Sequence, residues 1–156
     1  MHLSASEDLC VLVADDEAPA RQRIIDLLRR DSQVAAIIEA SDGLSAVEII
    51  QNRRPDLVFL DVQMPELNGL EVIAEVGVDH MPPTVFVTAY DEHAIRAFEA
   101  NALDYLLKPF SDERFDVTMA RVSTRMDERS LQEFGQRILH MISAAPAGDS
   151  RWTAWW

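Results

Sequence analysis

Short apolar runs alternate with stretches of helical spacing along most of the chain. Short, mostly apolar runs of four to seven residues predict strands at 9–14, 34–40, 57–60, 84–87 and 103–107. The first of them, rich in Val and Leu, is typical of a strand buried on both faces. Between these runs, apolar residues recur every three or four positions, which indicates helices; these lie at 18–30, from Ser45 to before Pro55, at 70–76, at 91–100 and from Ser111 onward. Ser41-Asp-Gly43 is predicted as a turn and Ser45 as the cap of the second helix.

This alternation predicts an α/β fold, a five-stranded parallel sheet in 2-1-3-4-5 order with helices on both faces. In such a sheet the ligand site lies at the carboxyl ends of the strands. Polar side chains stand at four of these ends: Asp15 and Asp16 after the first strand, Asp61 after the third, Thr88 at the end of the fourth and Lys108 at the end of the fifth. We therefore expect these five side chains to gather at one edge.

Carboxylates that gather in this way repel one another unless a cation lies between them. Oxygen ligands without His or Cys suit Mg²⁺, with Mn²⁺ as a second possibility, and both metals accept phosphate oxygens readily. A carboxylate can also form an aspartyl phosphate, and Asp61 is the best nucleophile candidate because a central strand carries it. Lys108 would add a positive charge and Thr88 a hydroxyl donor, as phosphoryl transfer requires.

Each acidic residue also has a plainer interpretation. An Asp after a strand is often a turn former or a helix cap, and Asp16-Glu17 would serve as an acidic helix start. The joint placement of these residues at four strand ends favours a common site.

Four segments, in order and at the proper spacing, resemble the receiver domains of two-component response regulators. They are VLVADDEAPARQRI, LVFLDVQMPELNGLEVI, VFVTAY and ALDYLLKPF, within a resemblance that covers about 8–125. The resemblance implies that Asp15 and Asp16 bind the metal and that Asp61 both accepts the phosphoryl group and coordinates Mg²⁺. The backbone carbonyl of Gln63 would be a further ligand.

The resemblance also implies a switch. Thr88 and Lys108 would bind the phosphoryl oxygens, Tyr105 would be the switch aromatic, and the bond before Pro109 would be cis. The run TAYDEHAIRAFEANALDYLLKPF is similar to receivers that precede a LytTR-type DNA-binding domain, with Phe98, Asn101 and Asp104 as part of the likeness.

Charge and composition narrow the class of protein. The chain has 156 residues, with 27 acidic against 14 basic side chains and a net charge of −13. This balance argues against a nucleic-acid surface and against anionic membranes. The single cysteine, Cys10, excludes an internal disulfide. The chain opens with no signal-peptide pattern, and its apolar runs fall far short of the roughly 20 residues of a membrane span, so we expect a cytoplasmic protein.

We divide the chain into a receiver at 8–126, a helical extension at 127–143 and a linker with a non-native or truncated tail at 144–156. Apolar residues of the extension predict contact with a second subunit or with an effector domain, and folding back onto the receiver is the alternative. They are Leu131, Phe134, Ile138, Leu139 and Ile142. We expect a homodimer, formed through these residues or through the face made by the helix at 91–100, the strand at 103–107 and the helix that starts at Ser111.

All three tryptophans lie in the last five residues. Back-translation of 149–156 with GC-rich codons, read from the third base, yields a strand-like alternation. We therefore hypothesise that this tail results from a frame slip or a cloning artefact and that the natural gene continues into a LytTR-type domain. Residues 149–156 would then have no fixed structure.

The predicted function is that of a response regulator receiver, not an enzyme, which takes a phosphoryl group from a sensor histidine kinase onto Asp61. DNA would be bound only through an effector domain outside this chain. One rival is a stand-alone adaptor receiver. The other is a Mg²⁺-dependent phosphohydrolase, which commonly has a second Asp where Gln63 stands.

Overall fold

A five-stranded parallel sheet forms the centre of the computed structural model, which describes residues 8–89 and 102–143. The strands are β1 (Leu9–Ala14), β2 (Val34–Ala40), β3 (Leu57–Leu60), β4 (Thr84–Thr88) and β5 (Ala102–Leu107). Their order is β2-β1-β3-β4-β5 and all pairs are parallel. This order confirms the predicted α/β fold, and the architecture is flavodoxin-like.

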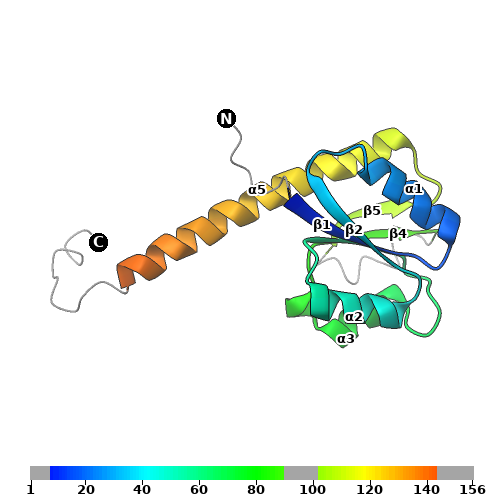
Figure 1. Cartoon of the computed structure of the whole chain (residues 1–156), viewed down its shortest axis with the longest axis horizontal. Helices are drawn as coiled ribbons and strands as arrows, with labels where there is room; N and C mark the ends of the chain where they lie inside the picture. The colour runs from blue at the N-terminus through cyan, green and yellow to red at the C-terminus, as the bar shows by residue number, and fades with distance from the viewer. Residues whose placement is uncertain (1–7, 90–101, 144–156) are drawn as a thin grey trace.

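Helices cover both faces of this sheet (Figure 1). They are α1 (Ala18–Leu28), α2 (Gly43–Arg53), α3 (Gly69–Val76), the short 3-10 helix η2 (Val78–His80) and α5 (Asp112–Ser143). The predicted helix at 91–100 lies outside the described residues. Because strand side chains alternate between faces, Val11 and Val13 pack with α1 and α5, whereas Leu12 packs with α2 and α3.

Helix ends differ from the sequence prediction at several places. Asp42, not Ser45, caps α2: its side chain accepts a hydrogen bond of 2.7 Å from the Ser45 N–H. The prediction that Ser45 caps this helix is therefore wrong, because Asp42 is the residue that has extended backbone and precedes the first turn. Helix α1 ends at Leu28, two residues before the predicted Arg30.

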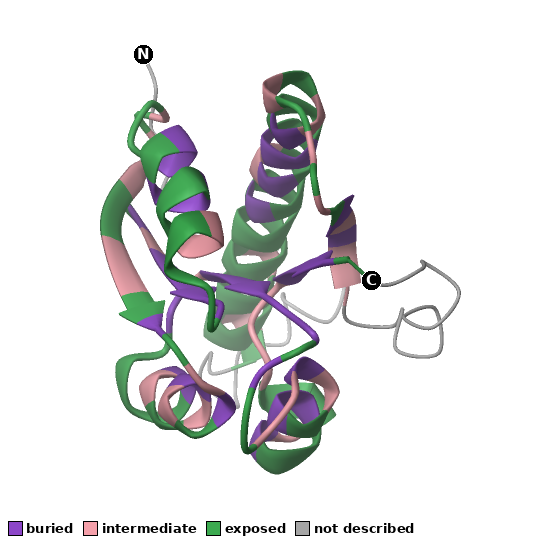
Figure 2. Ribbon diagram, turned by 90° about the vertical axis from the view of Figure 1, so that its right-hand side faces the viewer, coloured by how far each residue is buried: buried purple, intermediate pink, exposed green. Residues whose placement is uncertain are grey.

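The last helix is a single element of 32 residues. Its first half packs on the sheet through buried residues that include Phe115 and Met126. Its second half continues away from the sheet (Figure 1) and is almost entirely exposed in Figure 2. The alternative in which this segment folds back on the domain is therefore wrong.

Within residues 8–89 and 102–143, no helix is both long enough and apolar enough to cross a membrane. The tail at 144–156, including the segment of the proposed frame slip, lies outside the described residues.

Candidate functional site: an acidic pocket at the carboxyl ends of the strands

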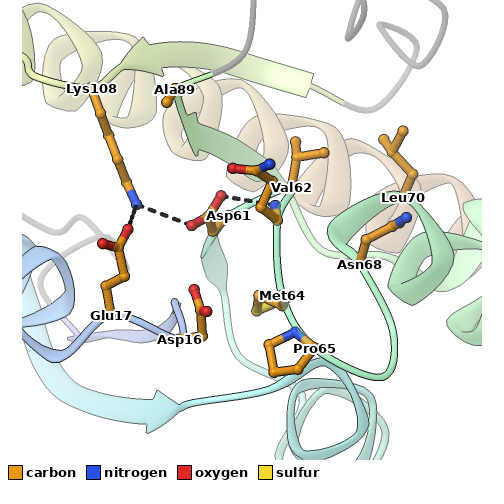
Figure 3. Close-up of a pocket in the computed structure, with 11 residues that line it drawn as sticks. Asp16, Glu17, Asp61, Val62, Met64, Pro65, Asn68, Leu70, Ala89 and Lys108 are labelled. Atoms are coloured by element: carbon orange, nitrogen blue, oxygen red, sulfur yellow. Dashed lines mark hydrogen bonds and ion pairs between the residues drawn. The ribbon is translucent and has the colours of Figure 1, made fainter.

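Three strand ends bring one lysine against two buried carboxylates, and Figure 3 shows the contact of this lysine with one of them, Asp61. Asp15 directly follows β1 and Asp61 directly follows β3, and both are buried. The ammonium Nζ of Lys108, directly after β5, lies 2.8 Å from Asp15 Oδ2 and 3.0 Å from Asp61 Oδ2. It also lies 3.3 Å from Glu17 Oε1. The cation therefore joins side chains that are far apart in the sequence.

Local backbone bonds fix the direction of the two buried carboxylates. The N–H of Asp61 donates to the carbonyl of Ala14 at 3.0 Å, so the ends of β1 and β3 are level. The N–H of Gln63 donates to Asp61 Oδ1 at 3.0 Å, and that of Glu17 donates to Asp15 Oδ1 at 2.9 Å. Each Asp thus forms a turn with the backbone two residues on, which leaves its other oxygen for Lys108.

Four carboxylates could hold a metal ion here. Asp15, Asp16, Glu17 and Asp61 each offer an oxygen, and these atoms all lie within 4.8 Å of one another. A set made only of oxygen donors, two of them exposed, fits Mg²⁺, which keeps several waters. Sequence reasoning treated Glu17 only as part of a helix start; its position directly after the acidic pair was the available signal.

The electrostatics of the site are dominated by burial. Burial raises the pKa of Asp61 to about 6, and the nearby charge of Asp15 adds to the rise, against the opposing hydrogen bonds from Gln63 and Lys108. For Lys108, burial alone would lower the pKa, but hydrogen bonds to Asp15 and Asp61 hold the pKa above its usual value. Lys108 is therefore charged at neutral pH, and the cluster around it keeps an excess of negative charge.

The cluster opens into a pocket of about 900 Å³. Asp16, Glu17, Asp61 and Lys108 are the charged residues of its lining (Figure 3). The remaining lining comes from the loop after β3, the start of α3 and the end of β4, and consists of Val62, Gln63, Met64, Pro65, Asn68, Leu70 and Ala89. A small anionic group therefore has an open route to Asp61.

The two predicted switch residues lie on the neighbouring strands β4 and β5. Thr88 is buried at the end of β4, and its carbonyl accepts a hydrogen bond of 2.9 Å from the N–H of Lys108. Tyr105 on β5 is partly buried, with its ring stacked on that of Phe86 at 6.1 Å between centroids. The Lys108–Pro109 bond is cis, as the resemblance implied. Of the three residues tied to the LytTR likeness, Phe98 and Asn101 lie outside the described residues.

The third of them, Asp104, is the centre of a polar cluster that sequence reasoning missed. Arg114 donates to both of its carboxylate oxygens, at 2.8 and 2.9 Å, and Arg121 and Thr118 each approach to 2.6 Å. Burial alone would raise the pKa of Asp104, but the hydrogen bonds from Arg114 and Thr118 lower it below the usual value. Arg114 also donates to the carbonyl of Tyr105 at 2.8 Å. The cluster therefore ties β5 to α5 beside the switch aromatic.

A second missed residue, Arg21, supports the acidic loop. From α1, its Nη1 donates to the backbone carbonyl of Asp15 at 2.8 Å, and its Nε donates to Glu39 Oε1 on β2 at 2.8 Å. The side chain is only 18% exposed. Arg21 therefore holds the segment that carries Asp15, Asp16 and Glu17.

This geometry agrees with the relationships of the chain to known proteins. The family model of the response regulator receiver domain matches residues 11–120, and the chain belongs to that family of two-component signalling proteins. It is 48% identical over 115 residues to an uncharacterized response regulatory protein of Yersinia pestis, with 74% of this chain and 48% of the relative covered. It is 42% identical over 123 residues to the transcriptional regulatory protein BtsR of Escherichia coli, with 79% and 50% covered. The chain thus spans about half the length of these curated relatives.

Solved structures show the same likeness. The response regulatory domain of mrkE from Klebsiella pneumoniae has a TM-score of 0.69 and 32% identity, covering 77% of this chain and 99% of that one. The receiver domain of AraT from Geobacillus stearothermophilus has a TM-score of 0.69 and 30% identity, covering 78% and 98%. Receiver domains bind Mg²⁺ at an acidic pocket, and this chain has a cluster of four acidic residues at the carboxyl ends of β1 and β3.

Proposed function

We propose that this chain is a phosphorylation-activated receiver that takes a phosphoryl group from a sensor histidine kinase onto Asp61. The observation that supports this role most directly is the position of Asp61, which is buried, 3.0 Å from the Lys108 ammonium and open to the pocket. The cytoplasmic location expected from the sequence is part of the proposal.

In the proposed reaction, a carboxylate oxygen of Asp61 attacks the phosphorus of a phosphohistidine. The new P–O bond forms as the P–N bond breaks, and the leaving imidazole takes up a proton. Lys108 neutralises phosphoryl oxygens that approach Asp61, while the Gln63 N–H keeps the acceptor carboxylate in line.

Asp15, Asp16 and Asp61, with the Gln63 carbonyl, would hold Mg²⁺, and Glu17 lies close enough to contribute. The metal would supply neutralisation of charge on the transferred group. The chain would act only on its own aspartyl phosphate, so its role is that of a signalling module rather than an enzyme with a free substrate.

The first prediction tests the acceptor. Incubation with acetyl phosphate and Mg²⁺ should add one phosphoryl mass to the wild-type chain, seen by intact-mass spectrometry, and none to Asp61→Asn. Asp26→Asn, an exposed position of α1, is the matched control and should be labelled normally. Undiminished labelling of Asp61→Asn, or a phosphoryl group found on His or Ser, contradicts the assignment.

We further propose that the receiver at 8–126 controls a LytTR-type DNA-binding domain through the helix at 127–143. Two points support this: the likeness of 88–110 to receivers of that class, and a relative named as a transcriptional regulatory protein of which this chain spans half. The genomic sequence beyond the codon of Ser143 tests it. A coding region for such a domain in either frame supports the proposal, and its absence favours the stand-alone adaptor.

A further inference from the structure

The loop that follows β5 begins with Lys108 and is fastened to α1 by one arginine. Arg23 of α1 donates through Nη2 to the backbone carbonyl of Phe110 at 2.7 Å and to Asp112 Oδ1 at 3.0 Å. Its guanidinium carbon also lies 4.9 Å from the centroid of the Phe110 ring, which is the geometry of a cation–π contact. A single side chain of α1 therefore holds the backbone two residues beyond the lysine.

This backbone is held on both sides of Lys108. On the strand side, the N–H of Lys108 donates to the carbonyl of Thr88 at 2.9 Å. Pro109 follows and has no N–H to donate. On the far side, the Phe110 carbonyl accepts the hydrogen bond from Arg23. The position of the lysine backbone therefore depends on Thr88 before it and on Arg23 after it.

Helix α1 also begins directly after the acidic loop of the pocket. Asp15 and Glu17 precede the helix, and their oxygens lie 2.8 and 3.3 Å from the Lys108 ammonium. The acidic loop and the lysine loop are thus joined twice, by these ion pairs and by Arg23. Because the lysine side chain is flexible, it can keep its ion pairs while its backbone shifts. The contact of Arg23 with the backbone is therefore the one that fixes the separation of the two loops.

Stacked rings extend this contact to the strand of the acceptor. The ring of Phe110 stacks on that of Phe115 at 6.2 Å between centroids, and Phe115 stacks on Phe59 at 5.7 Å. These separations are typical of favourable aromatic pairs. Phe59 lies on β3, two residues before Asp61. The loop that Arg23 holds is therefore packed, ring by ring, against the strand that carries Asp61.

We propose that Arg23 is a positioning residue for phosphoryl transfer, which holds the loop at 108–112 so that the Lys108 ammonium meets the phosphoryl group at Asp61. This inference rests on the proposed function of Asp61. Arg23 lies outside the described lining of the pocket and its side chain is 44% exposed, so it acts through Phe110 and the lysine backbone. A misplacement of about 1 Å at a reacting centre is enough to slow a transfer step strongly.

A matched pair of arginines tests the role in the transfer. Arg30 lies just beyond α1 and approaches the other carboxylate oxygen of Asp112, at 3.7 Å. With acetyl phosphate and saturating Mg²⁺, Arg23→Ala should slow the labelling of Asp61 about tenfold and Arg30→Ala less than about twofold. The Mg²⁺ affinity of Arg23→Ala, measured by titration calorimetry, should change less than about twofold, because Arg23 holds the lysine loop rather than a metal ligand.

Variants of Phe110 separate the ring from the arginine. Phe110→Leu removes the cation–π contact and the stacking and should slow the labelling severalfold, whereas Phe110→Tyr keeps the ring and should label at the wild-type rate. Equal losses for Arg23→Ala and Arg30→Ala, or a loss of Mg²⁺ affinity that matches the loss of rate, overturn the proposal.

The position of the loop can be measured without any phosphoryl group. Lys108 is the only lysine of the chain, so labelling with ¹⁵N-lysine gives one backbone amide signal in the NMR spectrum. Hydrogen exchange of this amide should be about tenfold faster in Arg23→Ala and nearly unchanged in Arg30→Ala, because the loop then opens more often. Unchanged exchange in Arg23→Ala overturns the proposal. A wild-type chain that takes up no phosphoryl group refutes the proposed function, whereas a labelled wild type with an equal rate in Arg23→Ala refutes only the role of Arg23.

Discussion

At the scale of single residues, the fold makes the charge of Asp61 costly while the proposed function requires it. Burial holds the pKa of this carboxyl at about 6, and a metal binds only the ionised form. We predict that the apparent Mg²⁺ affinity falls about tenfold per pH unit below pH 6 and levels off above pH 7. Titration calorimetry between pH 5 and 8 measures this. An affinity that is flat across that range contradicts a raised pKa.

Arg21 acts on the same site through the backbone of Asp15. We predict that Arg21→Ala weakens Mg²⁺ binding about tenfold, as losses around metal ligands typically do, and that Arg21→Lys, which can reach one partner, weakens it less. Arg29→Ala changes an exposed arginine just beyond α1 and is the control. If Arg21→Ala lowers the melting temperature but leaves the Mg²⁺ affinity unchanged, its role is only structural.

Sequence reasoning could find residues whose position follows from the strand order alone. Asp15, Asp61 and Lys108 each follow a strand directly, so the sheet topology already places them at one edge. The role of Arg21 and the polar contacts of Asp104 escaped notice because their partners come from other elements. Which side chains meet across elements depends on helix rotation and packing, which the spacing of apolar residues does not specify.

At the scale of elements, β4 and β5 connect the pocket to α5. The N–H of Lys108 binds the carbonyl of Thr88, and Arg114 of α5 binds both Asp104 and the carbonyl of Tyr105. A displacement of Thr88 toward a phosphoryl group would therefore act on strands that are fastened to the long helix. This arrangement supports a two-state switch biased by a local change in charge.

We predict that Thr88→Ala separates phosphorylation from switching. In chains labelled with fluorotyrosine, the two tyrosines give separate ¹⁹F resonances, and phosphorylation of the wild type should shift that of Tyr105. The Thr88→Ala variant should still be phosphorylated on Asp61, but its Tyr105 resonance should not shift. Thr88→Ser, which keeps the hydroxyl, should restore the shift. A normal shift in Thr88→Ala refutes the coupling.

Strands and helices were not equally predictable. The bounds of β1, β2 and β3 agree with the prediction. In β1 and β3 the apolar runs coincide with buried residues. The start of α2 was misplaced because Asp42 and Ser45 are both good capping residues, and only the backbone shows which of them precedes the first turn.

At the scale of the whole molecule, the buried negative charge that would bind the metal destabilises the metal-free fold. Without Mg²⁺, an Asp whose pKa rises on folding from 3.8 to about 6 leaves the fold at full stability below about pH 4, and this stability is lost as the pH rises from there through about 6. At neutral pH the ionised Asp61 carboxylate therefore lowers the free energy of unfolding. Bound Mg²⁺ raises this free energy again because the metal binds the folded state.

The last prediction follows from this balance. At pH 7.5 without Mg²⁺, Asp61→Asn should be more stable than the wild type by about 1–2 kcal/mol, which raises the melting temperature by about 2–5 °C for a chain of this size. At pH 5 the difference should be about half as large, because the unfolded carboxyl is already ionised there and folding must still protonate it, and the two should melt closest together below about pH 4. Saturating Mg²⁺ at pH 7.5 should stabilise the wild type more than the variant and shrink or reverse the difference. Differential scanning calorimetry measures the melting temperature under all three conditions. If the Asn variant is less stable than the wild type at pH 7.5 without metal, Lys108 compensates the buried charge in full.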